Sequence, residues 1–367
     1  MGKLKTEEFV VNMGPVHPAT HGVCRLMLTM DGEKVVKIEP VIGYLHRAIE
    51  KICENRTYPQ CIPLMDRFEY VTSMSTNQVF AQAAERLAGI EVPERAEYLR
   101  VIMLELNRIA SHLIFYGVTA MDLGALTPFL YGLREREYIV DLFEMTCGQR
   151  LTYNYIRVGG VSRDIPPQFV PKCREALKII GDKLRDYEGL LNENPIWLRR
   201  TRGIGHLPAD LAISYGVSGP VLRASGVDYD IRRDDPYSIY DRFDWEVPVR
   251  HNGDCYDRYL LRLDEIKQSI KIIEQALDGL PEGDIKAKVS PNFKPPAGEV
   301  YSRVENSRGE MGVYIQSDGT NKPLRVKCRG GSYNQLQALP HFGTDVLVAD
   351  LVAIFATLDI ILPEVDR

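Results

Sequence analysis

The spacing of apolar residues divides the chain into a β-rich beginning, a helical middle and a β-rich end. Residues 7–40 alternate apolar and polar positions on both sides of Asp31-Gly32, a pair typical of hairpin turns, which predicts a small N-terminal sheet. Beyond Leu45 the apolar residues recur every three or four positions, as on one face of a helix. This second pattern predicts long helices over residues 79–87, 96–116, 129–147, 170–191 and 257–280.

The second half of the chain is less regular. Residues 193–254 are rich in glycine, proline and charged residues but also in tyrosine, so we expect short ordered elements there and not a disordered linker. Alternation returns on both sides of Asp318-Gly319, which predicts a second β unit, and a helix is expected from about Thr344. The fold class is therefore a predominantly helical α+β protein, with an N-terminal sheet over residues 1–44, a helical body over 45–285 and a hairpin-and-helix unit over 286–367.

Composition excludes several classes of function. The 367 residues include 45 Lys and Arg against 50 Asp and Glu, and no run of five basic residues occurs, which argues against nucleic acid as the main partner. The N-terminus lacks the apolar stretch of a secretory signal. The longest apolar run, residues 346–362, contains two aspartates and is too short to predict a membrane span. We expect a cytoplasmic protein that is soluble or peripheral to a membrane.

The cysteines and glycines do not form familiar cofactor motifs. None of the seven cysteines belongs to a C-x-x-C pair, so they are predicted to be buried free thiols in a reducing compartment and not ligands of zinc or iron–sulfur clusters. The glycine pairs at residues 203–205 and 216–220 lack the strand–turn–helix setting and the third glycine of a dinucleotide fingerprint. The chain therefore carries no motif for binding a nucleotide.

Two histidines stand close together near the N-terminus. His17 and His21 are four residues apart, a spacing that would place both rings on one face of a helix, but Pro15 and Pro18 disfavour a helix. Without a third ligand nearby, metal binding is the less favoured interpretation. A structured loop that holds one functional imidazole is the better one, and a packing role remains open.

Two further segments combine polar groups with ordered surroundings. The run Asp66-Arg67-Phe68-Glu69-Tyr70 precedes a predicted helix and is either a capping and salt-bridge region or a place for chemistry. A loop is expected to begin near Asp122, because Gly124 and Pro128 break the preceding helical pattern. The residues alone lead to a cytoplasmic α+β protein with a histidine loop and a tyrosine loop.

Ordered motifs along the whole chain carry a resemblance to a known family. They are GPVHPATHG, IGYLHRAIEK, EVPERAEYLRVIMLELNRIASHL, DLGALTPF, GEMGVYIQSDG and the terminal EVDR. The chain resembles the 49-kDa-type (D) subunit of respiratory complex I, the proton-pumping NADH–quinone oxidoreductase. That family is similar in fold to the large subunit of nickel–iron hydrogenases, which hold their metal with two C-x-x-C pairs. Both pairs are missing here, since Cys61 lacks a neighbouring cysteine and the C-terminal stretch has none, so no metal of its own is expected.

The resemblance implies roles for the two loops. In the family, the residues at the His21 and Tyr70 positions reach the quinone headgroup, and the residue at the Asp122 position lies near that histidine. Two-electron reduction places negative charge on both carbonyl oxygens of a quinone, so a donor at each end stabilises the reduced form and can supply protons. An anionic Asp122 beside His21 would favour the imidazolium and hold its orientation.

The resemblance also implies an electron donor outside this chain, the terminal 4Fe–4S cluster of the adjacent B-type subunit. The arginines at the Arg47 and Arg67 positions lie beside that cluster, where a cation stabilises its reduced form. The alternative for either arginine is a buried ion pair. The carboxylates available for such a pair are Asp66, Glu50 and Glu69.

One departure from the family concerns Thr152, which stands where many members have a histidine near the cluster. Loss of an ionisable imidazole should lower the cluster potential and flatten its dependence on pH. This pattern resembles relatives that use lower-potential quinones, and it favours menaquinone as the substrate. The short connection over residues 281–298 is a second departure, shared with relatives fed by other donors, so NADH, reduced ferredoxin and a reduced deazaflavin are all compatible.

The implied partners are the B-, C- and I-type subunits of the peripheral arm, the H-type subunit of the membrane arm, and a quinone. The chain would lie on the cytoplasmic side of the cell (inner) membrane, attached through these partners, while proton pumping takes place in the membrane subunits. Two other functions remain open: the large subunit of a membrane-bound nickel–iron hydrogenase, and a scaffold of an electron-transfer complex that has lost its quinone chemistry.

Overall fold

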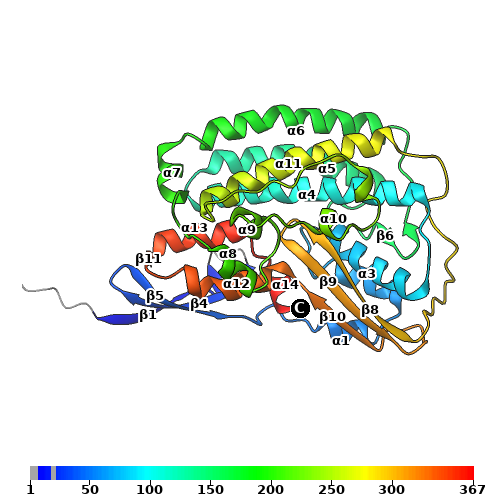
Figure 1. Ribbon diagram of the computed structural model, residues 1–367, viewed down its shortest axis with the longest axis horizontal. Coiled ribbons are helices and arrows are strands. Elements are labelled where there is room, and N and C mark those ends of the chain that lie inside the picture. Colours follow the sequence, from blue (N-terminus) through cyan, green and yellow to red (C-terminus); the bar gives the residue numbers. More distant parts are fainter. Residues whose placement is uncertain (1–6, 18–21) are drawn as a thin grey trace, which may run out of the picture.

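A layer of long helices covers two separate antiparallel sheets and the shorter helices around them (Figure 1). The structure is a computed structural model that describes residues 7–17 and 22–367. The expected imidazole of His21 therefore lies outside the described residues. His17 lies in the two-residue strand β2 (Val16–His17), which pairs with β3 (Gly22–Val23), so the expectation that this segment is not helical is confirmed for His17.

The N-terminal sheet has the strand order β1-β4-β5-β11. Its strands are β1 (Glu8–Met13), β4 (Arg25–Asp31), β5 (Lys34–Val41) and β11 (Val346–Leu347). The predicted hairpin turn is confirmed, because Gly32 has the left-handed φ of 62° that a tight turn between β4 and β5 requires. The last strand comes from the far end of the chain and pairs Val346 with Val35.

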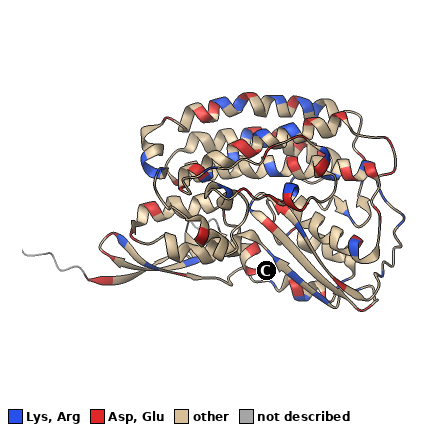
Figure 2. Cartoon of the chain, viewed as in Figure 1, with Lys and Arg blue, Asp and Glu red and all other residues tan. Residues whose placement is uncertain are grey.

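The five predicted long helices are present, and most extend beyond their predicted ends. They are α3 (Ser73–Ala88), α4 (Glu94–Asp122), α5 (Leu126–Cys147), α6 (Phe169–Leu191) and α11 (Cys255–Asp278). The helices α4 and α5 pack closely where glycine is required, since a Cβ on Gly132 would lie 2.6 Å from the carbonyl oxygen of Leu113. Basic and acidic residues alternate along α6, the outermost helix (Figure 2), which is typical of a surface exposed to solvent.

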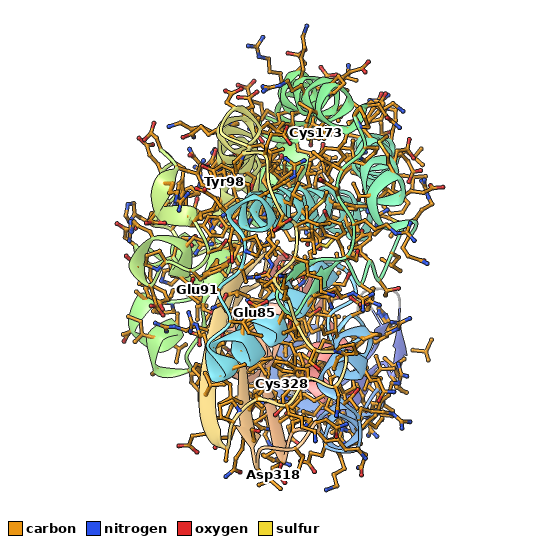
Figure 3. All side chains as sticks on the ribbon, turned by 90° about the vertical axis from the view of Figure 1, so that its right-hand side faces the viewer. Glu85, Glu91, Tyr98, Cys173, Asp318 and Cys328 are labelled. Carbon is orange, nitrogen blue, oxygen red and sulfur yellow. The ribbon has the colours of Figure 1, made fainter. Side chains whose placement is uncertain are left out.

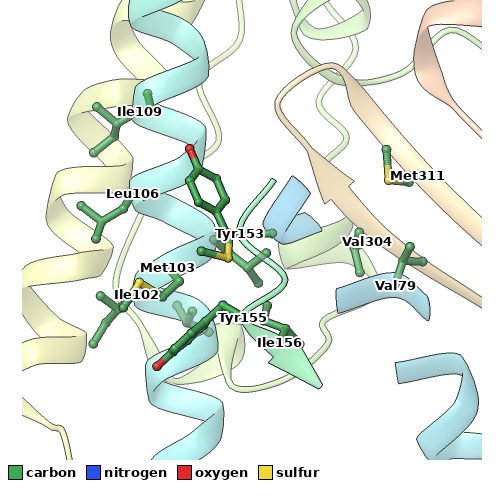
Figure 4. Close-up of a cluster of buried hydrophobic side chains, with 14 of the residues drawn as sticks. Val79, Ile102, Met103, Leu106, Ile109, Tyr153, Tyr155, Ile156, Val304 and Met311 are labelled. Carbon is green, nitrogen blue, oxygen red and sulfur yellow. The ribbon is translucent and has the colours of Figure 1, made fainter. Parts of the chain in front are cut away.

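Helix α4 is the centre of the larger core. Among residues 7–17 and 22–367 it is the one helix long and apolar enough to cross a membrane by length and composition, yet 89% of its most apolar window is buried inside the protein. It packs against α5, α11 and α13 (Val348–Leu358). Side chains from α3, α4, the segment after α5 and the second sheet meet beside it (Figure 4): Val79, Ile102, Met103, Leu106, Ile109, Tyr153, Tyr155, Ile156, Val304 and Met311.

The second sheet has the order β10-β9-β8, with β8 (Gly298–Asn306), β9 (Gly309–Ser317) and β10 (Arg325–Arg329), and it confirms the predicted second β unit. Helix α3 packs against β8 and β9. The seven cysteines are free, as predicted, and six of them are buried, whereas the predicted burial is wrong for Cys147, which is half-buried at the end of α5. Figure 3 shows Cys173 on α6 near the top of the view and Cys328 on β10 in its lower half.

Short elements connect these layers, including the predicted short elements of residues 193–254. They are α1 (Ile49–Cys53), α2 (Tyr58–Met65), β6 (Ile156–Arg157), β7 (Gly160–Val161), α7 (Pro195–Thr201), α8 (Ala209–Ser214), α9 (Gly219–Ala224), α10 (Ile231–Asp234), the 3-10 helix η2 (Tyr240–Arg242), α12 (Gly331–Phe342) and α14 (Leu362–Asp366).

The C-terminal part differs from its prediction in two ways. The helix expected from about Thr344 begins at Val348, because Val346 and Leu347 are extended and pair with β5. The helix α12 was not predicted, because it begins at Gly331 and contains Pro340, two residues that usually interrupt a helix. Pro340 lies in the last turn of α12, so the turns before it keep their hydrogen bonds.

Candidate functional site

Tyr70 lines a cavity of about 320 Å³ between α4 and the segment that follows α13. The wall is mostly apolar and includes side chains from both segments. Within the described part of the chain, the Tyr70 hydroxyl makes no hydrogen bond. Burial raises the pKa of this phenol above its ordinary value, so it keeps its proton at neutral pH and can donate it. The lining residues are Tyr70, Val71, Ile114, Phe115, Val118, Thr119, Arg308, Asp359, Ile360 and Ile361.

The turn that carries Tyr70 is held by its neighbour. The fully buried Glu69 accepts hydrogen bonds from the backbone N–H groups of Val71 at 3.1 Å and Thr72 at 2.7 Å, just before α3 begins. The predicted capping and salt-bridge region is therefore present, with Glu69 as the residue that binds the backbone. Burial raises the pKa of Glu69 to about 7, although the guanidinium of Arg308 opposes this shift.

Arg308 joins the two sides of the cavity. It lies in the turn between β8 and β9, is 1% exposed, and donates to Glu69 Oε1 at 3.3 Å and to Ser111 Oγ at 3.2 Å. On the other side it donates to the backbone carbonyl of Asp359 at 2.8 Å and to Asp359 Oδ1 at 3.0 Å. Asp359 has a left-handed φ of 60° at the end of α13, where the chain turns towards the cavity wall.

The patterns in the sequence did not identify Arg308 and Asp359 as site residues. Arg308 lies in a short turn with no motif of its own, and its partners lie far away in the sequence. Asp359 did leave a signal, because it interrupts the longest apolar run of the chain. A charge inside such a run is buried only when it is paired, so the interruption indicates an internal ionic site as readily as a break in a membrane span.

Asp122 lies at the end of the helical face that forms the cavity wall. Ile114 and Val118 are four residues apart on α4 and both line the cavity, and Asp122 follows four residues later as the last residue of the helix. Its side chain is half-buried. The predicted break after Asp122 is confirmed, since Gly124 has a φ of 91° and α5 begins at Leu126. The predicted proximity of Asp122 to His21 stays a prediction.

A second cavity brings together Arg67 and Thr152. It has a volume of about 350 Å³ and lies between α2 and the segment after α5. Arg157 and Arg163 also line it, and its lining contains no carboxylate. Thr152 has a left-handed φ of 55°, a conformation that a β-branched residue rarely adopts. Two residues predicted to lie near one redox centre thus share a cationic cavity.

Arg67 forms an ion pair with the buried Asp66, although its own guanidinium is partly exposed. Its side chain is 48% exposed, donates to the carbonyl oxygen of Pro63 at 2.7 Å and approaches Asp66 only to 3.7 Å. Asp66 is fully buried, and neither of its carboxylate oxygens has a hydrogen-bond partner among the described residues. Burial raises the pKa of Asp66 to about 7. The ion-pair alternative for Arg67 is therefore confirmed in part, because the pair with Asp66 forms but only its carboxylate is buried.

Arg47 lies apart from both cavities, in an exposed loop before α1. Within residues 7–17 and 22–367 it forms no ion pair, and Glu50 instead binds Lys327 at 3.1 Å. For Arg47, unlike Arg67, the ion-pair alternative is therefore wrong. In the same described residues, no group of three His, Cys, Asp or Glu side chains is arranged to hold a metal ion.

Comparison with known proteins identifies the family. The family model described as the respiratory-chain NADH dehydrogenase, 49 Kd subunit, matches residues 122–292 and 287–367. The chain therefore belongs to this family of respiratory-chain subunits, the 49-kDa subunits of complex I.

Individual relatives extend the match over the full chain. A protein named as the D subunit of NADH-quinone oxidoreductase, from Dehalococcoides mccartyi, is 54% identical over 365 residues, which cover 99% of this chain and 100% of that protein. Proteins of the same name from Clostridium beijerinckii and Bacillus anthracis are each 49% identical, over 100% and 99% of this chain and 99% and 100% of their own lengths. The family expected from the sequence motifs is confirmed.

Proposed function

We propose that this chain is the subunit of a complex-I-type NADH–quinone oxidoreductase that binds the quinone headgroup, with Tyr70 as the donor to one carbonyl oxygen. The observation that carries the proposal is Tyr70, which lines a largely apolar cavity of about 320 Å³ and whose hydroxyl has no hydrogen-bond partner in the described chain. Apolar walls with a few placed polar groups suit a flat, mostly apolar ring.

The chemistry of quinone reduction fits this wall. Two electrons and two protons convert the two carbonyl groups to hydroxyl groups, and negative charge develops on the oxygens before the protons arrive. A phenol that keeps its proton can hydrogen-bond one oxygen and donate to it. The buried guanidinium of Arg308 on the same wall favours the developing negative charge, although Glu69 and Asp359 balance part of its own charge.

We assign the second carbonyl oxygen to His21, on the strength of the family resemblance. Asp122 ends the α4 face that lines the cavity and is the carboxylate that would orient this imidazole. A carboxylate next to an imidazole favours its protonated form, so the pair would supply the second proton.

Electrons are proposed to come from a 4Fe–4S cluster held by the B-type subunit. The residues of the second cavity fit a neighbouring group of negative charge, because Arg67, Arg157 and Arg163 line it without a carboxylate among them. Arg47 is assigned to the same partner surface, where its exposed side chain is available. Thr152 in this cavity offers no proton-binding imidazole, which supports a low-potential quinone such as menaquinone.

The relatives' names support membership in a larger assembly. We infer contacts with the B-, C- and I-type subunits of the peripheral arm and with the H-type subunit of the membrane arm. We also infer a peripheral position on the cytoplasmic side of the inner membrane and proton translocation by the membrane subunits. A hydrogenase-like arrangement of the three regions, residues 1–44, 45–285 and 286–367, belongs to the same proposal.

Tyr70→Phe in the assembled complex tests the quinone role. Loss of the hydroxyl removes one donor and one proton source, and we expect quinone reduction to fall by about tenfold or more. Electron transfer from the physiological donor to an artificial acceptor should not change, because it does not need the cavity. The control is Tyr138→Phe, which removes the hydroxyl of a 40% exposed tyrosine on α5. Unchanged quinone reduction in Tyr70→Phe, in a fully assembled complex, refutes the proposal.

A further inference from the structure

The C-terminal end of the chain binds the loop that carries Arg47, although 323 residues separate Asp366 from Gly43. Asp366 accepts hydrogen bonds from two backbone N–H groups of this loop, that of Gly43 to Oδ1 at 2.8 Å and that of Leu45 to Oδ2 at 2.7 Å. The Nδ1 atom of His46 lies 2.8 Å from the backbone carbonyl oxygen of Asp366 and donates to it. One residue therefore fixes three points of the loop just before Arg47.

The loop has little else to hold it. Within the described chain, its other backbone hydrogen bond is internal and runs from the N–H of His46 to the carbonyl oxygen of Gly43 at 3.2 Å. Gly43, Tyr44, His46 and Arg47 are exposed, and within this loop only Leu45 is half-buried and packs against the core beside the N-terminal sheet. A carboxylate that accepts two backbone N–H bonds is a strong and directional restraint, because both bonds are charge-assisted.

The C-terminal segment is itself firmly anchored. Glu364 is fully buried and accepts from the backbone N–H groups of Gly331 at 3.0 Å and Ser332 at 3.3 Å, at the start of α12. The N–H of Ile361 donates to Ser332 Oγ at 3.2 Å, and Ile361 also lines the Tyr70 cavity. The segment from Ile361 to Asp366 therefore extends from the cavity wall to the Arg47 loop, between the two sheets (Figure 1).

We propose that Asp366 is a positioning residue, which fixes the loop over residues 43–47 and thereby holds the guanidinium of Arg47 against the redox partner. This inference rests on the proposed function, since it takes from it the role of Arg47 beside the cluster of the B-type subunit. Asp366 lines neither the Tyr70 cavity nor the Arg67 cavity, so it would act through the loop alone. The loop is exposed, so water can satisfy its N–H groups when Asp366 is replaced, and the variant should fold.

The experiment uses four variants of the assembled complex: Asp366→Ala, Asp366→Asn, Arg47→Ala and the double variant with both alanines. Hydrogen exchange of the peptide that contains residues 43–47 reports the restraint on the loop. The midpoint potential of the cluster in the B-type subunit, from a redox titration followed by electron paramagnetic resonance, reports the position of the charge. The control is Arg367→Ala, which removes the neighbouring side chain that lies 5.0 Å from the ring centre of Tyr333.

In Asp366→Ala we expect hydrogen exchange at the N–H groups of Gly43 and Leu45 to become about tenfold faster, because each group loses the hydrogen bond that protects it. The cluster potential should become more negative, in the same direction as in Arg47→Ala, and the double variant should show no shift beyond that of Arg47→Ala. Asp366→Asn should fall between, because its amide keeps one acceptor oxygen. Arg367→Ala should match the unmodified complex in both measurements.

Two results overturn the positioning role. Unchanged exchange in Asp366→Ala shows that the carboxylate does not restrain the loop. A potential that shifts in Arg47→Ala but not in Asp366→Ala shows that the restraint does not place the arginine. The proposed function fails in a different variant: an unshifted potential in Arg47→Ala removes the role of Arg47 itself, whatever Asp366 does.

Discussion

Arg308 binds Asp359 with two different nitrogens, Nε to the backbone carbonyl and Nη2 to the carboxylate. The two distances are 2.8 Å and 3.0 Å, and the third nitrogen, Nη1, reaches Glu69 beside Tyr70. A single guanidinium thus sets the distance between the two walls of the cavity. One wall comes from the turn before α3 and the other from the segment after α13. This geometry leads to the first prediction.

Arg308→Lys keeps the positive charge but loses the planar fork that binds three groups at once. We expect the complex to assemble and quinone reduction to fall by about tenfold, because Asp359 and Tyr70 lose their fixed spacing. Arg308→Met leaves the buried Glu69 without its cation and Asp359 with only Arg262 at 4.0 Å, and should destabilise the chain by about 3 kcal/mol, measured by thermal inactivation of the complex. Full quinone reduction in Arg308→Lys would contradict the spacing role.

Val118→Phe tests the volume of the cavity. The larger side chain projects from the half-buried wall position on α4 into a space of about 320 Å³. We expect the KM for quinone to rise about tenfold, with electron transfer to an artificial acceptor unchanged. Ile114→Val is the matched control, because it shortens a side chain of the same wall, which enlarges the cavity and lowers the stability of the fold by only about 1 kcal/mol. Equal KM values for both variants would show that quinone does not occupy this cavity.

Asp66→Asn tests the effect of burial on stability. The pKa of Asp66 is about 7 in the folded chain and 3.8 ordinarily, so between these two pH values the folded chain holds a proton that the unfolded chain releases. Stability from this group is therefore present below pH 3.8 and is lost as the pH rises towards 7, with each tenfold difference in proton affinity worth about 1.4 kcal/mol.

In Asp66→Asn the side chain is a neutral amide that cannot ionise, so the variant does not lose stability as the pH rises. We expect the variant to unfold at a higher temperature than the unmodified chain at about pH 8, with the difference shrinking as the pH falls towards about 4. Thermal unfolding at several pH values measures this. A difference that does not depend on pH would mean that Asp66 is ionised throughout.

Thr152→His tests the cationic cavity. Histidine accepts a left-handed backbone more readily than a β-branched residue, so the φ of 55° should not oppose the change. A new imidazole that titrates near about pH 6.5 should make the partner's cluster potential depend on pH, by at most about 59 mV per pH unit for one electron and one proton. Thr152→Ser is the control. A potential that stays independent of pH in Thr152→His would show that position 152 does not face the cluster.

The long helices were predictable because each repeats its apolar positions over many turns. Their ends were harder, since α4 begins and ends with polar or small residues that packing, not periodicity, holds in the helix. The helix α12 escaped prediction because Gly331 and Pro340 weaken its local signal, and the carboxylate of Glu364, which binds its first N–H groups, lies 33 residues from Gly331. Tertiary contacts of this kind leave no trace in a local pattern.

The residues of the site also divide into those that the sequence identifies and those that only folding brings together. Tyr70, Asp122, Arg67 and Thr152 were assigned to the site through the resemblance to the family, and the structure brings Arg67 and Thr152 into one cavity. The partners that shape the Tyr70 cavity were not named, because Arg308 lies 239 residues from Glu69. Motifs identify a residue type at a position, whereas the pKa and spacing of that residue depend on groups brought together only by folding.

The pairing of β11 with β5 has a consequence for synthesis of the protein. The ribosome releases β5 long before it makes Val346 and Leu347, because residues 42–345 lie between the two strands. The N-terminal sheet therefore cannot acquire its fourth strand until residues 346 and 347 have emerged, and such distant pairings form slowly. Until then the open edge of β5 can pair with other nascent chains, which makes it a natural point for a chaperone to protect.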